Sequence, residues 1–170
     1  AKREFDLSLR KFISEVNGKE INREPTVDLT NLNKMVDGAK VTTATYNHNK
    51  KPVAVKPGDI VTYTIRVYNE GELDGYVGEI TDYLPVELEF INDIENYPEE
   101  TDFNAGYGWR IDPSNNRVIK TNKLAYSSEA ADRDPNASTL IKAYNGTTLD
   151  YKEVKVKCTV KTSKETLKKI

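Results

Sequence analysis

Strict alternation of apolar and polar side chains is the feature that most limits the folds open to this chain. Residues 61–67 alternate Val61, Tyr63, Ile65 and Val67 with Thr62, Thr64 and Arg66. A period of two is that of a β-strand with one buried face. The same period returns at 154–161, where valines and Cys158 alternate with lysines and a threonine. The pattern predicts a half-buried strand at each place.

Shorter extended segments and turns surround these two strands. Residues 5–13 alternate in the same way, and Asn17-Gly18 then predicts a hairpin turn. Residues 76–85 and 86–91 are extended, and residues 109–121 suggest two short strands around a turn. Residues 92–108 indicate a loop. Residues 124–146 are ambiguous, and within them residues 127–131 are compatible with the start of a short helix.

Many short strands separated by turns predict an all-β fold, an antiparallel β-sandwich. We expect residues 1–170 to form a single domain with a long irregular insertion at 92–146, in which a short helix is possible.

The composition excludes several classes of protein. One cysteine, Cys158, permits no internal disulfide and no cysteine-based zinc site, and the single histidine, His48, argues against a histidine triad. A formal net charge of −2 gives no reason to expect a nucleic-acid partner. No apolar run is long enough to span a bilayer. No cofactor is expected, and no carboxylate pair has a diagnostic catalytic spacing, so an enzyme is not predicted.

Residues 56–85, KPGDIVTYTIRVYNEGELDGYVGEITDYLP, resemble the conserved-repeat Ig-like domains of Gram-positive bacterial surface proteins. The shared elements are a Pro-Gly-Asp turn at 57–59, the strand Val61 to Asn69, Gly71, and the Asp-x-Leu-Pro ending at 82–85. The flanking stretches FDLSLRKFISEVNGKEI, TATYNHNKKPVAV and LDYKEVKVKC are also similar to members of this isopeptide-type family.

The resemblance implies an Ig-like antiparallel β-sandwich that serves as a non-catalytic structural or stalk module of an extracellular, cell-wall-associated protein. Its partners would be neighbouring domains of the same polypeptide, with no membrane insertion. The family usually ends with a strand containing I-x-N-x-A, and this motif is absent here. We therefore expect either a fragment of a larger multidomain surface protein or a closing strand supplied by another molecule.

Lys11 is anomalous, because it occupies the apolar phase of residues 5–13. A buried ammonium requires a carboxylate partner, a neutral state or a covalent fate. Asp82 shares the inward phase of Ile80 and Leu84, which makes it the candidate partner. Three hypotheses stay open: a lysine that reaches solvent, a buried Lys11–Asp82 salt bridge, and an autocatalytic Lys–Asn crosslink of the kind that the resemblance implies, with Asp82 as the helper acid. The last predicted strand, at 154–161, has no asparagine among its inward-facing residues.

Two further sets of residues suggest binding. Trp109, with Tyr107 and Tyr126 nearby in sequence, is a candidate platform for glycan stacking, although aromatic residues also serve as core residues. Asp132, Asp134 and Asn136 have the spacing of a calcium loop, but the glycine and the final glutamate of such a loop are missing. The alternative function is accordingly an adhesive module that recognises a host protein or glycan through residues 92–146.

Overall fold

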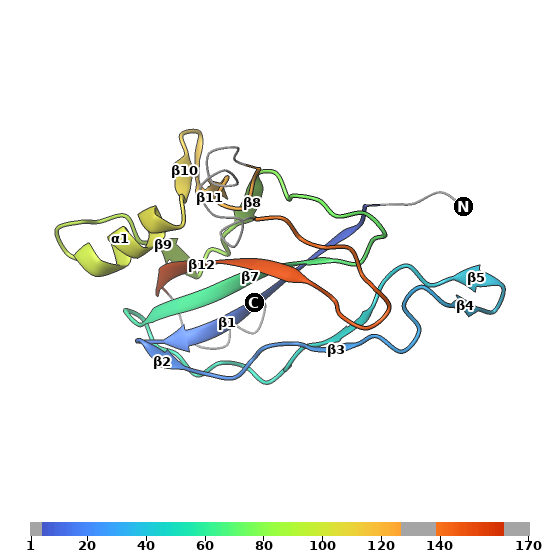
Figure 1. The fold of residues 1–170 in the computed structure, drawn as a ribbon. Coiled ribbons are helices and arrows are strands. Elements are labelled where there is room, and N and C mark those ends of the chain that lie inside the picture. The colour runs from blue at the N-terminus through green and yellow to red at the C-terminus, as the bar shows by residue number, and fades with distance from the viewer. Residues whose placement is uncertain (1–4, 127–138, 162–170) are drawn as a thin grey trace.

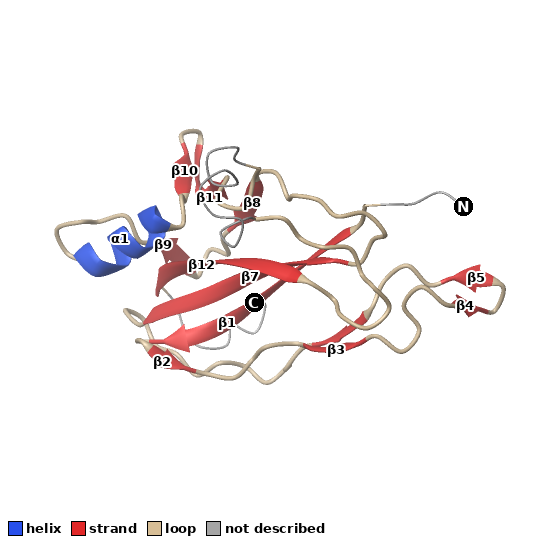
Figure 2. Cartoon of the chain, viewed as in Figure 1, coloured by secondary structure: helices blue, strands red, loops and turns tan. Residues whose placement is uncertain are grey.

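The computed structural model describes residues 5–126 and 139–161. The fold is mostly β, with antiparallel sheets and one short helix (Figures 1 and 2), which confirms the all-β, sandwich-like prediction. The strands are β1 Leu7–Val16, β2 Lys19–Glu20, β3 Thr26–Asp28, β4 Met35–Val36, β5 Ala39–Lys40, β6 Thr45–Asn47, β7 Ile60–Asn69, β8 Ile80–Tyr83, β9 Leu88–Phe90, β10 Arg110–Asp112, β11 Asn115–Thr121 and β12 Tyr151–Val160, and the helix is α1 Pro98–Gly106.

Two sheets enclose the main core. The first has the order β2-β1-β7-β12-β9, and the second has the order β10-β11-β8. Both β1 and β12 pair antiparallel with β7, so they run parallel to each other on its two sides. Figure 1 shows the consequence: the chain enters β1 at one end of the sheet and leaves β12 at the other.

The predicted alternation of β7 is only half right. Its inward residues Val61, Tyr63 and Val67 are fully buried, as expected. However, Thr62, Thr64 and Arg66 on the opposite face are buried as well. β7 is the central strand of its sheet, and the guanidinium of Arg66 lies against the rings of Phe12 and Tyr151. Long side chains from both neighbouring strands therefore cover the outer face of β7, which the period of a single strand does not reveal.

The alternation of β1 also requires correction. Ile13 is fully buried, but Leu9 is 49% exposed and Phe5 is 41% exposed. A β-bulge between Ile13 and Glu15 shifts the register, and Phe12 and Ile13 are both buried beside it. β8 spans only four residues, so the second sheet is much shorter than β1 and leaves the first half of that strand partly uncovered.

The expected loop at 92–108 contains a helix instead. Pro98 stands at the first turn and is followed by Glu99 and Glu100, a favourable helix start because proline needs no donor there and acids suit the positive end of the dipole. The helix lacks an apolar face, so periodicity gave no signal for it. Its one buried side chain, Asn104, donates to the carbonyls of Ile91 and Lys157 and accepts from the amide of Lys157, which anchors α1 beside β12.

A separate arm extends along the outer face. β3 pairs with β6, and the β4–β5 hairpin projects at one end of the molecule (Figure 1). Leu32, Ala44 and Tyr144 form a small second core under this arm. The carboxylate of Glu70, at the end of β7, accepts hydrogen bonds from the hydroxyl of Thr43, the amide of Ala44 and the hydroxyl of Tyr46. This buried acid, which sequence reasoning missed, attaches the arm to the sandwich.

Candidate functional site

Lys11 and Asp82 meet between the two sheets. Lys11 lies on β1 opposite Ile65 of β7, and Asp82 lies on β8 opposite Ile119 of β11. The distance from Lys11 Nζ to Asp82 Oδ1 is 2.9 Å, and the two side chains are 28% and 10% exposed. The residues that shared an inward phase in the sequence thus form an ion pair that ties one sheet to the other, and the ammonium keeps partial access to water.

Tyr63 completes this inter-sheet cluster from β7. Its hydroxyl donates a hydrogen bond to Asp82 Oδ2, and the centroid of its ring lies 5.2 Å from Lys11 Nζ. Burial, reinforced by the negative charges around it, raises the pKa of Tyr63 well above its ordinary value. The phenol therefore stays protonated and serves as a donor, so both oxygens of Asp82 have a partner.

Cys158 lies beside this cluster on β12 and is fully buried. Burial raises the pKa of the Cys158 thiol far above its ordinary value, and the nearby carboxylate of Asp82 adds to this shift. A thiol held in its neutral form is a poor nucleophile. Cys158 is therefore a core residue, as its place in the alternation suggested.

Raised pKa values of Tyr63 and Cys158 predict a loss of stability at alkaline pH. Above the ordinary pKa of cysteine, 9.0, and then of tyrosine, 10.0, the unfolded chain releases protons that the folded chain retains. The full free energy of unfolding is therefore present below pH 9. It falls by about 1.4 kcal/mol per pH unit above pH 9 because of Cys158, and by as much again above pH 10 because of Tyr63. Urea unfolding at pH 7 to 11 measures this. Cys158→Ala should show a shallower decline between pH 9 and 10, and an unchanged slope would contradict the assignment.

The electrophile for a Lys–Asn crosslink is not among the contacts of this cluster. Of the residues that the structure describes, no asparagine hydrogen-bonds to Lys11 or Asp82. Asn69, fully buried at the end of β7, donates to the carbonyls of Leu73 and Ile141 and accepts from the amide of Gly71. The amide of Asn104 is occupied by backbone groups beside β12. The crosslink hypothesis therefore stays a prediction, and neither of these two side chains is positioned to serve it.

The proposed aromatic platform does not form. Trp109 is buried in the main core, and its indole nitrogen donates to the carbonyl of Lys155 at 2.8 Å. Tyr107 is half-buried and packs against Phe103, whereas Tyr126 is exposed and contacts Tyr76. Because Trp109 is buried in the core, these three rings share no exposed surface on which a sugar could stack. The spacing along the chain gave no information on which face each ring would take.

The remaining candidates concern metals and membranes. Asp132, Asp134 and Asn136 lie outside the described residues. Within 5–126 and 139–161, no group of three or more histidine, cysteine or acidic side chains is arranged to hold a metal ion. In the same part of the chain, no helix is long and apolar enough to cross a membrane.

A second buried cation, missed from the sequence, lies on the outer face of the first sheet. Arg66 forms ion pairs with Glu24 and, at 2.9 Å, with Glu153, and its guanidinium lies 4.2 Å from the ring centroid of Tyr151. These partners raise the pKa of Arg66 despite the opposing effect of burial, which is the largest contribution. Because Glu24 and Glu153 already neutralise the guanidinium, this is a structural cluster, and it holds Glu24 against the sheet.

In comparisons with known proteins, no family model, no curated protein and no solved structure matches the chain.

Proposed function

We propose that this chain is a non-catalytic structural module, a stalk or spacer unit of an extracellular, cell-wall-associated bacterial protein. The observation that carries the proposal is the parallel course of β1 and β12 on either side of β7. Tension applied through the two ends of the chain would load the hydrogen bonds of both pairings in shear, so that many would have to break together. A spacer benefits from this arrangement.

Two other features support the proposal. The inter-sheet cluster of Lys11, Asp82 and Tyr63 connects the second sheet to the first by directional bonds. The resemblance of residues 56–85 to repeat domains of Gram-positive surface proteins agrees with a location at the cell surface and with neighbouring domains as partners.

Force spectroscopy in two pulling directions tests the spacer function. Handles at the two chain ends load β1 and β12 in shear. Handles on Lys19→Cys and Lys161→Cys, which both lie just beyond the C-terminal ends of β1 and β12 at one end of the sheet, load the strands one hydrogen bond at a time; Cys158 is buried and does not compete for the handles. We expect a clearly higher rupture force in the first direction. Equal forces in both directions would contradict the proposal.

The crosslink is tested separately by intact mass. Formation of a Lys–Asn isopeptide bond by Lys11 releases ammonia, so the measured mass would fall about 17 Da below the calculated mass. The Lys11→Met variant cannot form this bond and would have its own full calculated mass. We expect the chain alone to have its full calculated mass, because the described contacts of Lys11 and Asp82 include no carboxamide. A deficit of 17 Da that disappears in Lys11→Met would contradict this expectation.

The adhesive alternative has less support. Trp109 lies in the core, and the described part of residues 92–146 includes a helix that packs beside β12 and two short strands. The depression bordered by Asn92, Ile111 and Asn116 has a volume of only about 180 Å³. This is small for a ligand site, since such pockets commonly exceed about 300 Å³.

A further inference from the structure

Six of the nineteen lysine and arginine side chains in the described residues have an acidic partner, and four of the others lie around one segment of the chain. Lys11, Lys40, Arg66, Arg110, Lys120 and Lys161 form ion pairs. Arg10, Arg23, Lys50 and Lys51, which we call the basic patch, form none within residues 5–126 and 139–161. An unpaired basic patch on a chain of net negative charge is a candidate for an anionic partner.

Short contacts join Arg10 and Arg23 to the segment 46–51, which carries Lys50 and Lys51. The guanidinium of Arg10 lies 4.2 Å from the ring centroid of Tyr46, and Arg23 donates to the carbonyl of Asn49 at 2.9 Å. Burial, and then the positive charge of Arg10, lower the pKa of His48 in this segment. Arg10 and Arg23 therefore flank the segment 46–51, in which Lys50 and Lys51 are exposed.

Arg10 is held in place without using its hydrogen-bonding capacity. Among the described residues its side chain donates no hydrogen bond, and its buried Nε has no partner. Stacking on Tyr46 restricts the guanidinium, so less conformational entropy is lost when an acceptor arrives. A planar cation fixed in this way suits a carboxylate, which it can bind through two parallel hydrogen bonds.

The same molecule carries carboxylates that are equally free of ion pairs. Asp93, Glu95, Glu99, Glu100 and Asp102, which we call the acidic segment, lie in and before α1, and residues 92–106 contain no basic residue. None of the five forms a salt bridge with a described residue. Ile94, within the acidic segment, is 54% exposed and offers an apolar contact.

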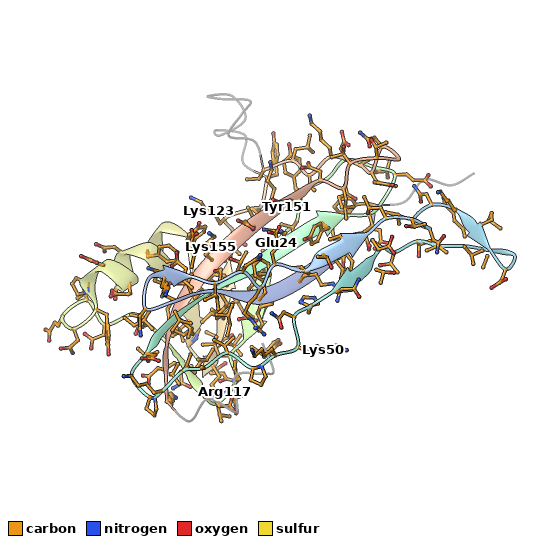
Figure 3. The ribbon with its side chains drawn as sticks, turned by 90° about the horizontal axis from the view of Figure 1, so that it is seen from below. Glu24, Lys50, Arg117, Lys123, Tyr151 and Lys155 are labelled. Carbon is orange, nitrogen blue, oxygen red and sulfur yellow. The ribbon has the colours of Figure 1, made fainter. Side chains whose placement is uncertain are left out.

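The two surfaces cannot meet within one molecule. Figure 3 shows Lys50 projecting from one edge, away from the helix at the far end of the molecule. Both surfaces are on the outside of the sandwich, and Arg10 points to the face of β1 opposite to that of its neighbour Lys11, because successive strand residues alternate. Neither surface overlaps the inter-sheet cluster, so the inference does not depend on the spacer function.

We propose that the basic patch binds the acidic segment of a second copy of this chain. Two different surfaces make a head-to-tail contact, which repeats from copy to copy instead of closing on itself as a two-fold dimer does. The contact is small and charged. It is therefore weak and sensitive to salt, because screening acts strongly on exposed charges.

Sedimentation velocity of the full chain tests the proposal. Between about 10 µM and 1 mM in 50 mM NaCl, we expect the weight-average sedimentation coefficient to rise with concentration, as for a small interface. In 500 mM NaCl the apparent association constant should fall by about tenfold or more. A single monomer coefficient at every concentration in low salt, or association that salt leaves unchanged, would overturn the proposal.

Charge reversal identifies the surfaces. Lys50→Glu/Lys51→Glu and Glu95→Lys/Glu99→Lys should each be monomeric alone and should associate when mixed. The matched control is Lys123→Glu/Lys142→Glu, which makes the same change in net charge at two exposed lysines outside the patch and should associate like the unmodified chain. A carbodiimide crosslinker should join Lys50 or Lys51 to Glu95 or Glu99 between copies. Association lost equally in the control overturns the proposal, as does a monomeric chain whose basic patch instead binds polyphosphate.

Discussion

Lys11→Met should lower the free energy of unfolding by about 2 kcal/mol, because it leaves a carboxylate in the interior without its cation. Asp82 is only 10% exposed and would keep the hydrogen bond from Tyr63 alone. The loss is smaller than that for a fully buried pair, since Lys11 is 28% exposed and solvent already screens its charge. Urea unfolding at pH 7 gives the value.

Two further variants separate the ion pair from simple loss of packing. Asp82→Asn keeps an acceptor for Tyr63 and leaves an ammonium that can still reach water, so we expect a loss of about 1 kcal/mol. The double variant Lys11→Met/Asp82→Leu removes both charges and should lose less than the two single variants together, because well-packed apolar residues often replace a buried pair at little cost.

The matched control is the pair Lys120–Asp112, which joins β11 to β10 at 3.2 Å on the surface. Lys120→Met should cost clearly less than Lys11→Met, because solvent screens a pair at the surface. If Lys11→Met costs no more than this control, or if the losses of the Lys11 and Asp82 variants simply add, the inter-sheet pair is not a stabilising element.

Trp109→Ala should have the larger effect, a loss of about 3–5 kcal/mol, as for other large aromatic residues removed from a core. Trp109 is 6% exposed within the main cluster, and its indole nitrogen also satisfies the carbonyl of Lys155. Trp109→Phe retains most of the volume and removes that hydrogen bond, so a loss of about 1–2 kcal/mol is expected. Thermal and urea unfolding measure both.

Tyr126→Ala is the control for an aromatic residue that the core does not use. Tyr126 is 61% exposed, and its removal should change stability by about 0.5 kcal/mol or less. A stable, folded Trp109→Ala protein that loses binding on a glycan array would contradict the core assignment and restore the platform hypothesis.

Local pattern was sufficient where a residue's environment follows from its neighbours in the chain. Alternation predicted the inward face of β7 and of β12, and Asn17-Gly18 predicted the β1–β2 hairpin, in which both residues adopt positive φ. The shared phase of Lys11 with apolar residues, and of Asp82 with Ile80, also identified these two groups as candidate partners, with a lysine that reaches solvent left as an alternative. A strand period determines the face of each side chain, so these inferences needed no knowledge of the partner strands.

Other features depend on contacts that no local pattern encodes. α1 has no apolar stripe and is anchored by one amide, Asn104, whose partners lie 13 and 53 residues away. Burial of Arg66 on the outer face requires Glu24 and Glu153, and the buried Glu70 requires the arm at 43–46.

The sequence by itself therefore determined the all-β class, the main strands and the inward phase of Lys11 and Asp82. Only the tertiary structure decided that these two groups meet, that Trp109 fills the core, and that the basic patch and the acidic segment form no ion pair with any described residue. Periodicity specifies which way a side chain points, whereas distance between segments is set by how the two sheets and the arm pack.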